Sequence, residues 1–323
     1  MFRSLVSSVF SSLLISAIVI GQLGCAARNS KKNILRESEY RRTMERQKQG
    51  ALSSGEKELT GKVPEMNAEG YERLGDNYLT QGNINLAFLQ YDKARDLEPN
   101  NNGIHYKIGC LFLEKGLSEE AEREFREILK TDPNYALAYE GIGRVYFNMR
   151  KFVEAEKEFQ QAIKLNTALW QSYNYLGIIY DKQKKFEDAI EQYKKAIDLK
   201  PDTGILFNNL GMSLYLKGEY ESALRSFEEA LKKDPSKSRV YYNNMALALC
   251  RLEKYEEAFE AFRKGSDEAT AYYNIGCVYM KVGKYKEAVN AFEKAVEKKP
   301  VFYVSAFENM KKAKAAINIP SVQ

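Results

Sequence analysis

The sequence predicts an all-α solenoid of about seven helix pairs closed by a C-terminal capping helix. The 323 residues contain only seven prolines and combine 44% hydrophobic with 29% charged residues, a composition that suits long amphipathic helices. A Leu/Ile-Gly pair recurs along the chain, and five of its glycines are 34 residues apart. A repeat of this length indicates helix pairs that bury their faces only against neighbouring pairs.

Residues 1–24 have the features of an export signal. Arg3 precedes an apolar run from Leu5 to Ile20, and Gly24 stands directly before Cys25. We expect cleavage before Cys25. Two alternatives remain open: an uncleaved anchor, because about 20 apolar residues span a bilayer, and a soluble product cleaved near Ala27.

The Gly24-Cys25 step resembles the lipobox of bacterial lipoproteins, with Gln22 where that family prefers leucine. The resemblance implies a diacylglycerol on Cys25, which would attach the chain to a membrane. Ala26, rather than aspartate, follows the cysteine. By the same resemblance, this residue favours the outer membrane, with the chain facing the periplasm.

Residues 25–67 form a polar segment that we interpret as a flexible, basic tether. Residues 26–66 carry ten Lys/Arg against six Asp/Glu, so the net charge of 67–323 is about zero. Binding to nucleic acid depends on cationic side chains that neutralise phosphates. The nearly neutral remainder of the chain therefore argues against a nucleic-acid partner.

The repeats occupy residues 68–302. An alanine follows each glycine after 12 residues and an aromatic residue after 16, and a further copy has Ala246 in place of the glycine. The glycines are Gly75, Gly109, Gly143, Gly177, Gly211 and Gly276. This pattern resembles the tetratricopeptide-repeat (TPR) family, which implies seven pairs of a first helix A and a second helix B in a right-handed superhelix. Small residues at fixed offsets let the two helices of a pair approach closely.

Residues 303–323 are expected to supply the capping helix and a short tail. Lys311, Lys312 and Lys314 lie on the outward face of this helix, and its apolar residues cover the last repeat. Such a cap is required because the final repeat would otherwise expose its hydrophobic side.

Catalytic and metal-binding motifs are not apparent. The chain has four cysteines and one histidine, without the spacings of a metal site or a nucleophile motif. His105 stands at the fourth position of the second repeat, where packing is the simplest role. We therefore expect a protein that is not an enzyme, without a cofactor or a small-molecule substrate.

The candidate binding site is a groove on the concave side of repeats four to seven. In the TPR family, helix A positions line this groove and bind extended peptides. Asparagine side chains offer both a donor and an acceptor to a peptide backbone, although the same residues could be ordinary solvent-facing positions. The residues that resemblance places there are Asn174, Asn208, Asn209, Asn243, Asn244, Tyr273, Asn274, Met212 and Tyr215.

Two further features depart from this pattern. In repeats one to three, the corresponding helix A positions carry acidic residues, including Glu72, Asp76 and Glu140. Such a surface would suit a basic partner. Repeat six is short, since 30 residues separate Ala258 from Ala288. We predict that its helix B ends near Gly265 in a left-handed cap, and that repeat seven packs at a changed angle.

The last two repeats are similar to the TPR lipoprotein of tight-adherence (Flp) pilus assembly. The similarity lies in residues 242–249 and 271–276. It implies a membrane-tethered scaffold that helps to assemble a pilus or secretion complex. A lipoprotein of polysaccharide export or outer-membrane protein insertion is an alternative. A non-catalytic subunit of an envelope glycosyltransferase is an alternative of another class.

Overall fold

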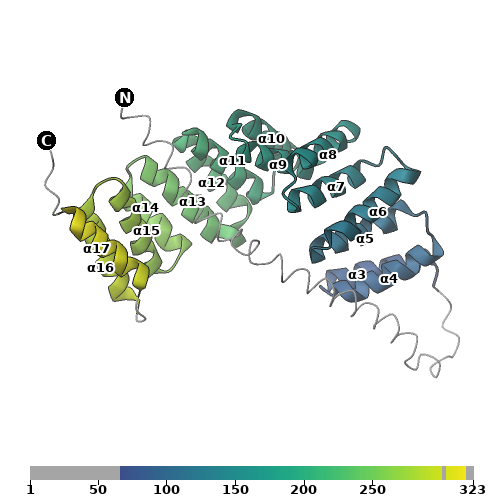
Figure 1. Cartoon of the computed structure of the whole chain (residues 1–323), viewed down its shortest axis with the longest axis horizontal. Coiled ribbons are helices and arrows are strands. Elements are labelled where there is room, and N and C mark those ends of the chain that lie inside the picture. The colour runs from purple at the N-terminus through teal and green to yellow at the C-terminus, as the bar shows by residue number, and fades with distance from the viewer. Residues whose placement is uncertain (1–65, 300–302, 318–323) are drawn as a thin grey trace, which may run out of the picture. The chain divides into compact units, whose positions relative to one another are not determined.

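The computed structural model describes residues 66–299 and 303–317, which fold into helices without a strand among them (Figure 1). The chain divides into two compact units, residues 1–167 and 168–323. The described part of the first unit, from residue 66, contains three helix pairs: α3 (Ala68–Thr80) with α4 (Ile84–Leu97), α5 (Asn102–Lys115) with α6 (Ser118–Thr131), and α7 (Ala136–Asn148) with α8 (Phe152–Leu165).

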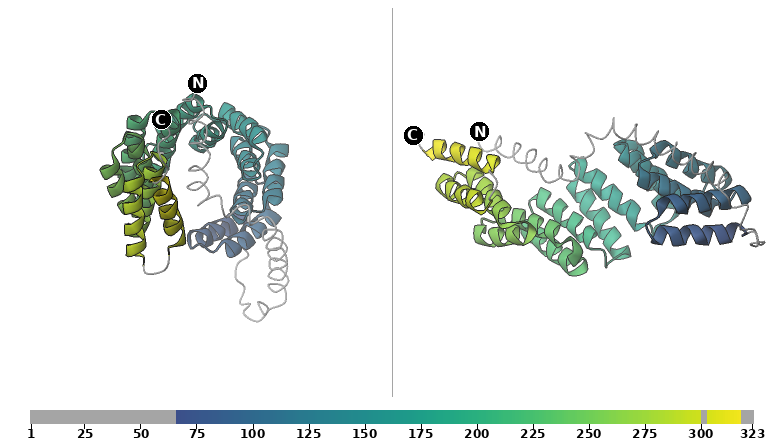
Figure 2. Two further views of the ribbon diagram at one scale, coloured as in Figure 1. Left: turned by 60° about the vertical axis from the view of Figure 1, so that its left-hand side comes forward. Right: turned by 90° about the horizontal axis from the view of Figure 1, so that it is seen from below.

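The second unit contains four helix pairs and a final helix in its described residues. Helices of this unit that follow one another in the chain lie side by side in both views of Figure 2. The pairs are α9 (Trp170–Lys182) with α10 (Phe186–Leu199), α11 (Gly204–Lys217) with α12 (Tyr220–Lys233), α13 (Ser238–Arg251) with α14 (Tyr255–Gly265), and α15 (Glu268–Lys281) with α16 (Tyr285–Lys298). A short 3-10 turn, η1 (Pro235–Lys237), precedes α13, and α17 (Val304–Ile317) ends the unit. The prediction of an all-α fold with seven helix pairs and a terminal helix is confirmed.

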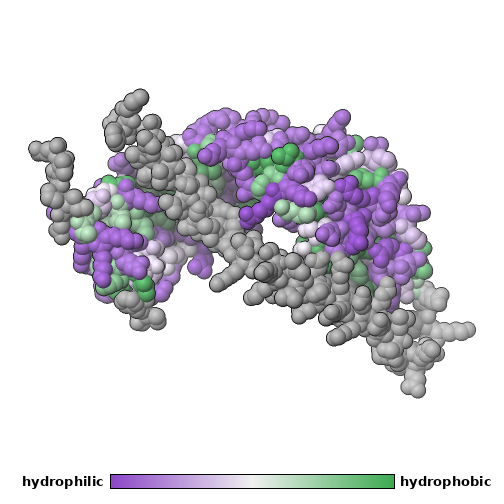
Figure 3. All heavy atoms as spheres, viewed as in Figure 1, coloured by the Kyte–Doolittle hydropathy of each residue, from purple (hydrophilic) through white to green (hydrophobic). Residues whose placement is uncertain are grey.

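The predicted signal, Cys25 and nearly all of the tether lie outside the described residues. Among the helices that the structure does describe, none is both long enough and apolar enough to span a bilayer. The visible face of the described residues is mostly hydrophilic, with hydrophobic side chains in small patches (Figure 3).

In six of the seven repeats, an aromatic ring of helix B lies on a glycine of helix A. A β-carbon added at Gly109 would lie 2.7 Å from the ring of Phe125, closer than atoms can approach. The same contact recurs at five other glycines, where the distance ranges from 2.4 to 2.8 Å. The spacing of 16 residues between glycine and aromatic residue therefore joins helix A to helix B within a repeat. The ring of Phe125 also reaches the next repeat, since a β-carbon added at Gly141 of α7 would lie 2.6 Å from it.

The turn between the two helices of every pair contains one residue in the left-handed conformation. Glycine fills this position in four pairs, with φ between 74° and 99°. Arg150, Lys184 and Glu253 fill it in the other three, with φ of 60° or 61°. Glycine tolerates this conformation because it has no β-carbon, whereas the three larger residues adopt it at a cost in free energy.

The terminal helix α17 covers the last repeat as a cap. Ala306 and Ala313 are fully buried in one cluster with Phe292 of α16. Lys314 lies on the outer side and pairs with Glu293 at 2.8 Å. Lys311 and Lys312 are exposed as well. The predicted orientation of the capping helix is therefore confirmed.

Repeat six ends where its shortened spacing indicated. Helix α14 has 11 residues and stops at Gly265, and Asp267 then caps α15 by accepting from the backbone of Thr270. The prediction of a left-handed cap is wrong, because Gly265 is not among the residues with positive φ and Ser266 is extended (φ −152°). Glycine is needed here for another reason: an added β-carbon would lie 2.5 Å from the Oδ1 atom of Asn243.

Candidate functional site

The asparagines of repeats four to six form a continuous chain of side-chain hydrogen bonds. Asn209 of α11 donates to Asn174 of α9 at 2.9 Å. Asn208 donates to Asn209 at 3.4 Å, and Asn244 of α13 donates to Asn208 at 2.7 Å. The ladder suggested by the sequence is therefore present, and much of its hydrogen-bonding capacity is used between repeats.

Two asparagines of this ladder have buried side chains. Asn208 and Asn244 are only 6% and 4% exposed. A buried amide must find a partner, because its desolvation is otherwise not offset. Asn244 donates to Asn208, and Asn208 donates in turn to Asn209, so we assign Asn208 and Asn244 to the packing of α11 against α13 and not to ligand contact.

Asn243 also differs from its predicted role. Its Nδ2 atom donates to the carbonyl oxygen of Gly265 at 3.2 Å, and its Oδ1 atom is buried without a hydrogen-bond partner among the described residues. The residue therefore joins the two helices of repeat six. Asn244, which stands 36 residues after Asn208, takes the place in the ladder instead.

Tyr273 fastens the capping helix. Its hydroxyl accepts from Asn309 of α17 at 3.2 Å, and its ring lies 5.8 Å from Phe292 and 5.1 Å from Tyr303. Burial, followed by the neighbouring Cys277, raises the pKa of Tyr273 to about 12. The hydroxyl therefore stays protonated at neutral pH and serves the contact with α17.

The remaining predicted residues form a partly accessible strip of uncharged side chains, and the positive charge of Arg251 lies near Tyr215. Half-buried amides alternate there with half-buried apolar side chains, and the exposed Val240 stands one helical turn before Asn244. Hydrogen-bonding amides beside apolar contacts suit an extended peptide. We call this strip the ladder surface and define it as Asn174, Asn209, Met212, Tyr215, Val240 and Asn274.

A second polar network is centred on Asp181 in the same unit as the ladder. Asp181 of α9 accepts from Tyr193 of α10 at 2.8 Å and from Ser213 of α11 at 2.7 Å. Burial raises the pKa of the Asp181 carboxyl above its usual value, and the two hydrogen bonds oppose this shift. The network joins three helices of the second unit, α9, α10 and α11.

The acidic residues at these helix A positions of the first unit are largely paired or buried. Lys107 pairs with both Glu72 and Asp76, each at 2.7 Å. Tyr91 also donates to Asp76 at 2.7 Å, and Glu140 is only 1% exposed. The hypothesis of an open acidic groove is therefore wrong for these three carboxylates, since a lysine that the sequence pattern did not single out lies between two of them.

His105 has the structural role that its position indicated. The ring is 9% exposed, with Nδ1 at 2.6 Å from Glu124 and Nε2 at 2.7 Å from the carbonyl oxygen of Pro99. The histidine thereby connects the α4–α5 turn to α6. Both ring nitrogens are engaged in this packing contact.

The three cysteines of the described repeats are free thiols. Burial raises the pKa of Cys250 to about 12 and also raises those of Cys110 and Cys277. Thiols in such surroundings are poor nucleophiles. Across residues 66–299 and 303–317, no three His, Cys, Asp or Glu side chains are grouped so that they could hold a metal ion.

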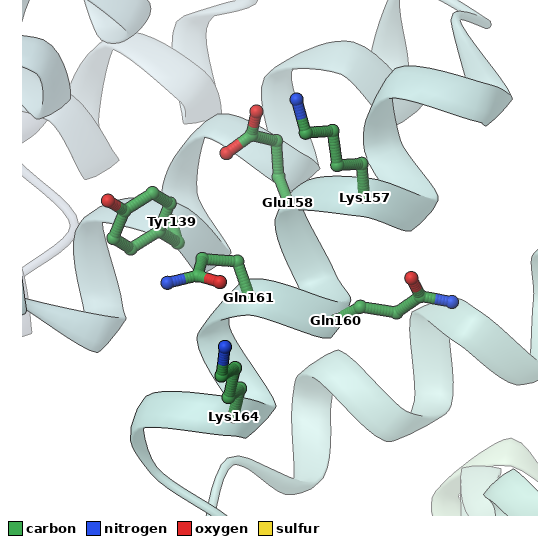
Figure 4. Close-up of a pocket in the computed structure, with 6 residues that line it drawn as sticks. All are labelled: Tyr139, Lys157, Glu158, Gln160, Gln161 and Lys164. Atoms are coloured by element: carbon green, nitrogen blue, oxygen red, sulfur yellow. The ribbon is translucent and has the colours of Figure 1, made fainter.

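A depression of 490 Å³ lies in the first unit between α7 and α8 (Figure 4). Its lining is polar and consists of Tyr139, Lys157, Glu158, Gln160, Gln161 and Lys164. Burial raises the pKa of Glu158. The lining thus combines one carboxylate with two lysines, one tyrosine and two amides.

Comparison with known proteins agrees with the fold. The family model described as the C-terminal domain of cilia and flagella-associated protein 70 matches residues 35–271, and the model described as the tetratricopeptide repeat matches residues 269–301. Comparison with curated proteins gives no match.

Several solved structures are similar. MamA is 30% identical over 51% of this chain and 97% of its own, with a TM-score of 0.43. The APC/C hetero-tetramer Cut9–Hcn1 is 20% identical over 78% of this chain and 50% of that chain, with a TM-score of 0.57. A tetratricopeptide-repeat protein from Parabacteroides merdae is 16% identical over 76% of this chain and 98% of its own, with a TM-score of 0.51.

The last two likenesses share only the fold with this chain. Tetratricopeptide repeats are scaffolds suited to protein–protein interaction and are generally non-catalytic. Because the longer family match covers well over half of its length, the chain belongs to the tetratricopeptide-repeat proteins, in the family described by the cilia and flagella-associated protein 70 C-terminal domain.

Proposed function

We propose that the chain is a lipid-anchored scaffold whose ladder surface binds an extended segment of a partner protein. The observation that carries this proposal is the strip of half-buried amides and apolar side chains on α9, α11, α13 and α15. Two of its amides, Asn174 and Asn209, are held in place by the hydrogen-bonded ladder, so a partner would not have to order them on binding.

The setting of this function in the cell rests on the amino-terminal segment. The apolar run before Gly24-Cys25 supports export and lipidation at Cys25. We place the protein in the bacterial envelope, on the outer membrane and facing the periplasm. There it would help to assemble a pilus or secretion complex. Genes for pilin, secretin and a secretion ATPase beside its own gene would support this assignment, and polysaccharide synthase genes would oppose it.

Two matched variants test the ladder surface. Val240 is 41% exposed on the surface, and Val153 is 75% exposed on α8 of the first unit. Val240→Glu places a negative charge beside the amide and apolar side chains of the surface and should weaken binding of a captured partner at least about tenfold. Val153→Glu adds the same charge elsewhere and should leave binding unchanged.

The partner itself can be identified by photo-crosslinking. A photoreactive phenylalanine at Met212 or Asn274 should crosslink one protein in intact cells, and the same group at Val153 should not. If Val240→Glu captures this protein as well as the wild type does, the partner uses another surface.

Lipidation has its own test. Labelled palmitate should enter the wild-type chain and be absent from Cys25→Ser. Label retained by the variant would exclude Cys25 as the acceptor, and a mature chain that begins with Met1 would favour an uncleaved anchor.

A further inference from the structure

A second groove opens on the side of α15 away from the ladder surface. It has a volume of 430 Å³ and lies between α14 and α16, with α15 as its floor. Tyr272, Ile275 and Tyr279 of α15 face this groove, whereas the adjoining Tyr273 contacts α17. The two surfaces therefore use different faces of the same helix.

The groove is lined by two pairs of aromatic rings. Tyr255 of α14 and Tyr279 of α15 have ring centroids 5.2 Å apart, and Phe259 and Tyr272 have centroids 4.6 Å apart. Aromatic faces attract cations. The protein already uses this attraction, because the Nζ atom of Lys284 lies 4.1 Å from the centroid of Tyr255.

Negative charge is concentrated at the same place. Glu256 of α14 and Glu287 of α16 line the groove from opposite walls and are both exposed. Burial, followed by the charges of these two glutamates, raises the pKa of Tyr279. Unlike Glu260, which pairs with Arg263 at 2.7 Å, neither glutamate has an ion-pair partner among the described residues.

One basic side chain lines the groove, and it does not neutralise these two carboxylates. The Nζ atom of Lys294 of α16 lies 5.4 Å from the ring centroid of Tyr272. The end of the groove around Tyr279 is therefore aromatic and carries two carboxylates, with the single ammonium of Lys284 beside it on Tyr255. Phosphate-bearing ligands would be repelled there, and a cationic side chain would be attracted.

We propose that this groove binds a basic segment of a partner protein. A lysine or arginine of the segment lies between Glu256 and Glu287 over Tyr279, and an apolar neighbour packs against Phe259 and Ile275. The volume of the groove exceeds the need of a single cationic group, which favours a peptide over a small cation. Since the ladder surface lies on another face of α15, the scaffold can hold two partners at once.

The test uses two fluorescent octapeptides and the full chain. The basic peptide is Gly-Ser-Leu-Arg-Leu-Lys-Ser-Gly, and the matched acidic peptide has glutamate in place of arginine and lysine. Fluorescence anisotropy should detect the basic peptide only. In Glu256→Gln/Glu287→Gln its Kd should rise about fivefold, because two exposed charge contacts are lost. These exposed, isosteric changes should not alter the fold.

Control variants distinguish binding in this groove from attraction of the basic peptide to the overall negative charge, and from binding at the ladder surface. Glu228→Gln/Glu297→Gln removes the same charge from exposed positions outside the groove and should leave the Kd unchanged. Val240→Glu should also leave it unchanged, so failure of the ladder surface and failure of this groove are distinguishable. Absence of binding to the wild type, or an equal loss in the control pair, would overturn the proposal.

Discussion

The side-chain amide of Asn244 donates to that of Asn208 over 2.7 Å inside the second unit, joining α13 to α11. Both residues are nearly inaccessible to solvent. Removing one partner leaves a buried polar group unsatisfied, which costs about 1–3 kcal/mol. We therefore predict that Asn244→Ala lowers the free energy of unfolding by this amount.

A double-mutant cycle with Asn208→Ala checks this prediction by urea denaturation. The two changes should be non-additive by about 0.5–3 kcal/mol, because the second removes a partner already lost. Asn274→Ala, on the ladder surface, is the control and should stay within about 0.5 kcal/mol of the wild type. Additive losses would show that the pair does not act as a unit.

The same pair shows why the sequence predicted the helices but not all of the site. Glycines and alanines at a fixed spacing predict which helices approach each other, because only small residues fit there. No comparable spacing rule predicts whether an asparagine is exposed or buried. Polarity favours the surface, yet Asn208 and Asn244 are buried because each supplies what the other needs.

Asn243 shows the same limit in another way. Its amide donates to the carbonyl oxygen of Gly265 and not to another asparagine of the ladder. The position of an asparagine in the repeat does not show which partner its amide meets. Similarly, the neutralisation of Glu72 and Asp76 by Lys107 required coordinates, since 31 residues separate Lys107 from Asp76.

Asp181 gives a prediction for pH dependence. Its pKa is raised by burial above the usual value of 3.8, so the native state binds this proton more tightly than the unfolded state does. The resulting stabilisation is fully present below the unfolded pKa and is lost as pH rises through the raised native pKa. The free energy of unfolding of the wild type, minus that of Asp181→Asn, should therefore fall as pH rises from 3.8.

Asp202 is the control because its shift has the opposite sign. The hydrogen bond from Lys233, at 2.8 Å, lowers the pKa of this exposed carboxyl. The corresponding difference for Asp202→Asn should rise with pH. Urea denaturation at several pH values measures both differences, and a flat profile for Asp181→Asn would contradict the role of burial.

Lys184 tests the left-handed turn between α9 and α10. A residue with a β-carbon pays about 1–2 kcal/mol for this conformation, and glycine does not. Lys184→Gly should therefore raise the free energy of unfolding by about 1 kcal/mol, after the greater flexibility of glycine in the unfolded chain is subtracted.

The reverse change at Gly218 is the matched control. Its φ is +99°, and an added β-carbon would meet only the Tyr220 hydroxyl at 4.0 Å, so space is available and strain alone acts. Gly218→Ala should lower stability by about 1 kcal/mol. A loss of stability in Lys184→Gly would mean that contacts of the lysine outweigh the backbone strain.

The last prediction concerns the close approach at the end of α14. A β-carbon at Gly265 would lie 2.5 Å from Oδ1 of Asn243 and 2.9 Å from the carbonyl oxygen of Arg239. The backbone oxygen cannot rotate away, so the end of α14 must move from α13. Gly265→Ala should therefore lower the free energy of unfolding by about 1–3 kcal/mol, the usual effect of overpacking.

The neighbouring Lys264 is exposed and provides the control. Lys264→Ala removes a surface side chain from the same helical turn and should change stability by about 0.5 kcal/mol or less. Hydrogen exchange offers a local readout, because displacement of α14 should speed exchange of the Ala261 and Phe262 amides more than that of amides in α10. If Gly265→Ala and Lys264→Ala have equal effects, the glycine is not required for the contact between α13 and α14, and the early end of α14 must then depend on the cap that Asp267 supplies to α15.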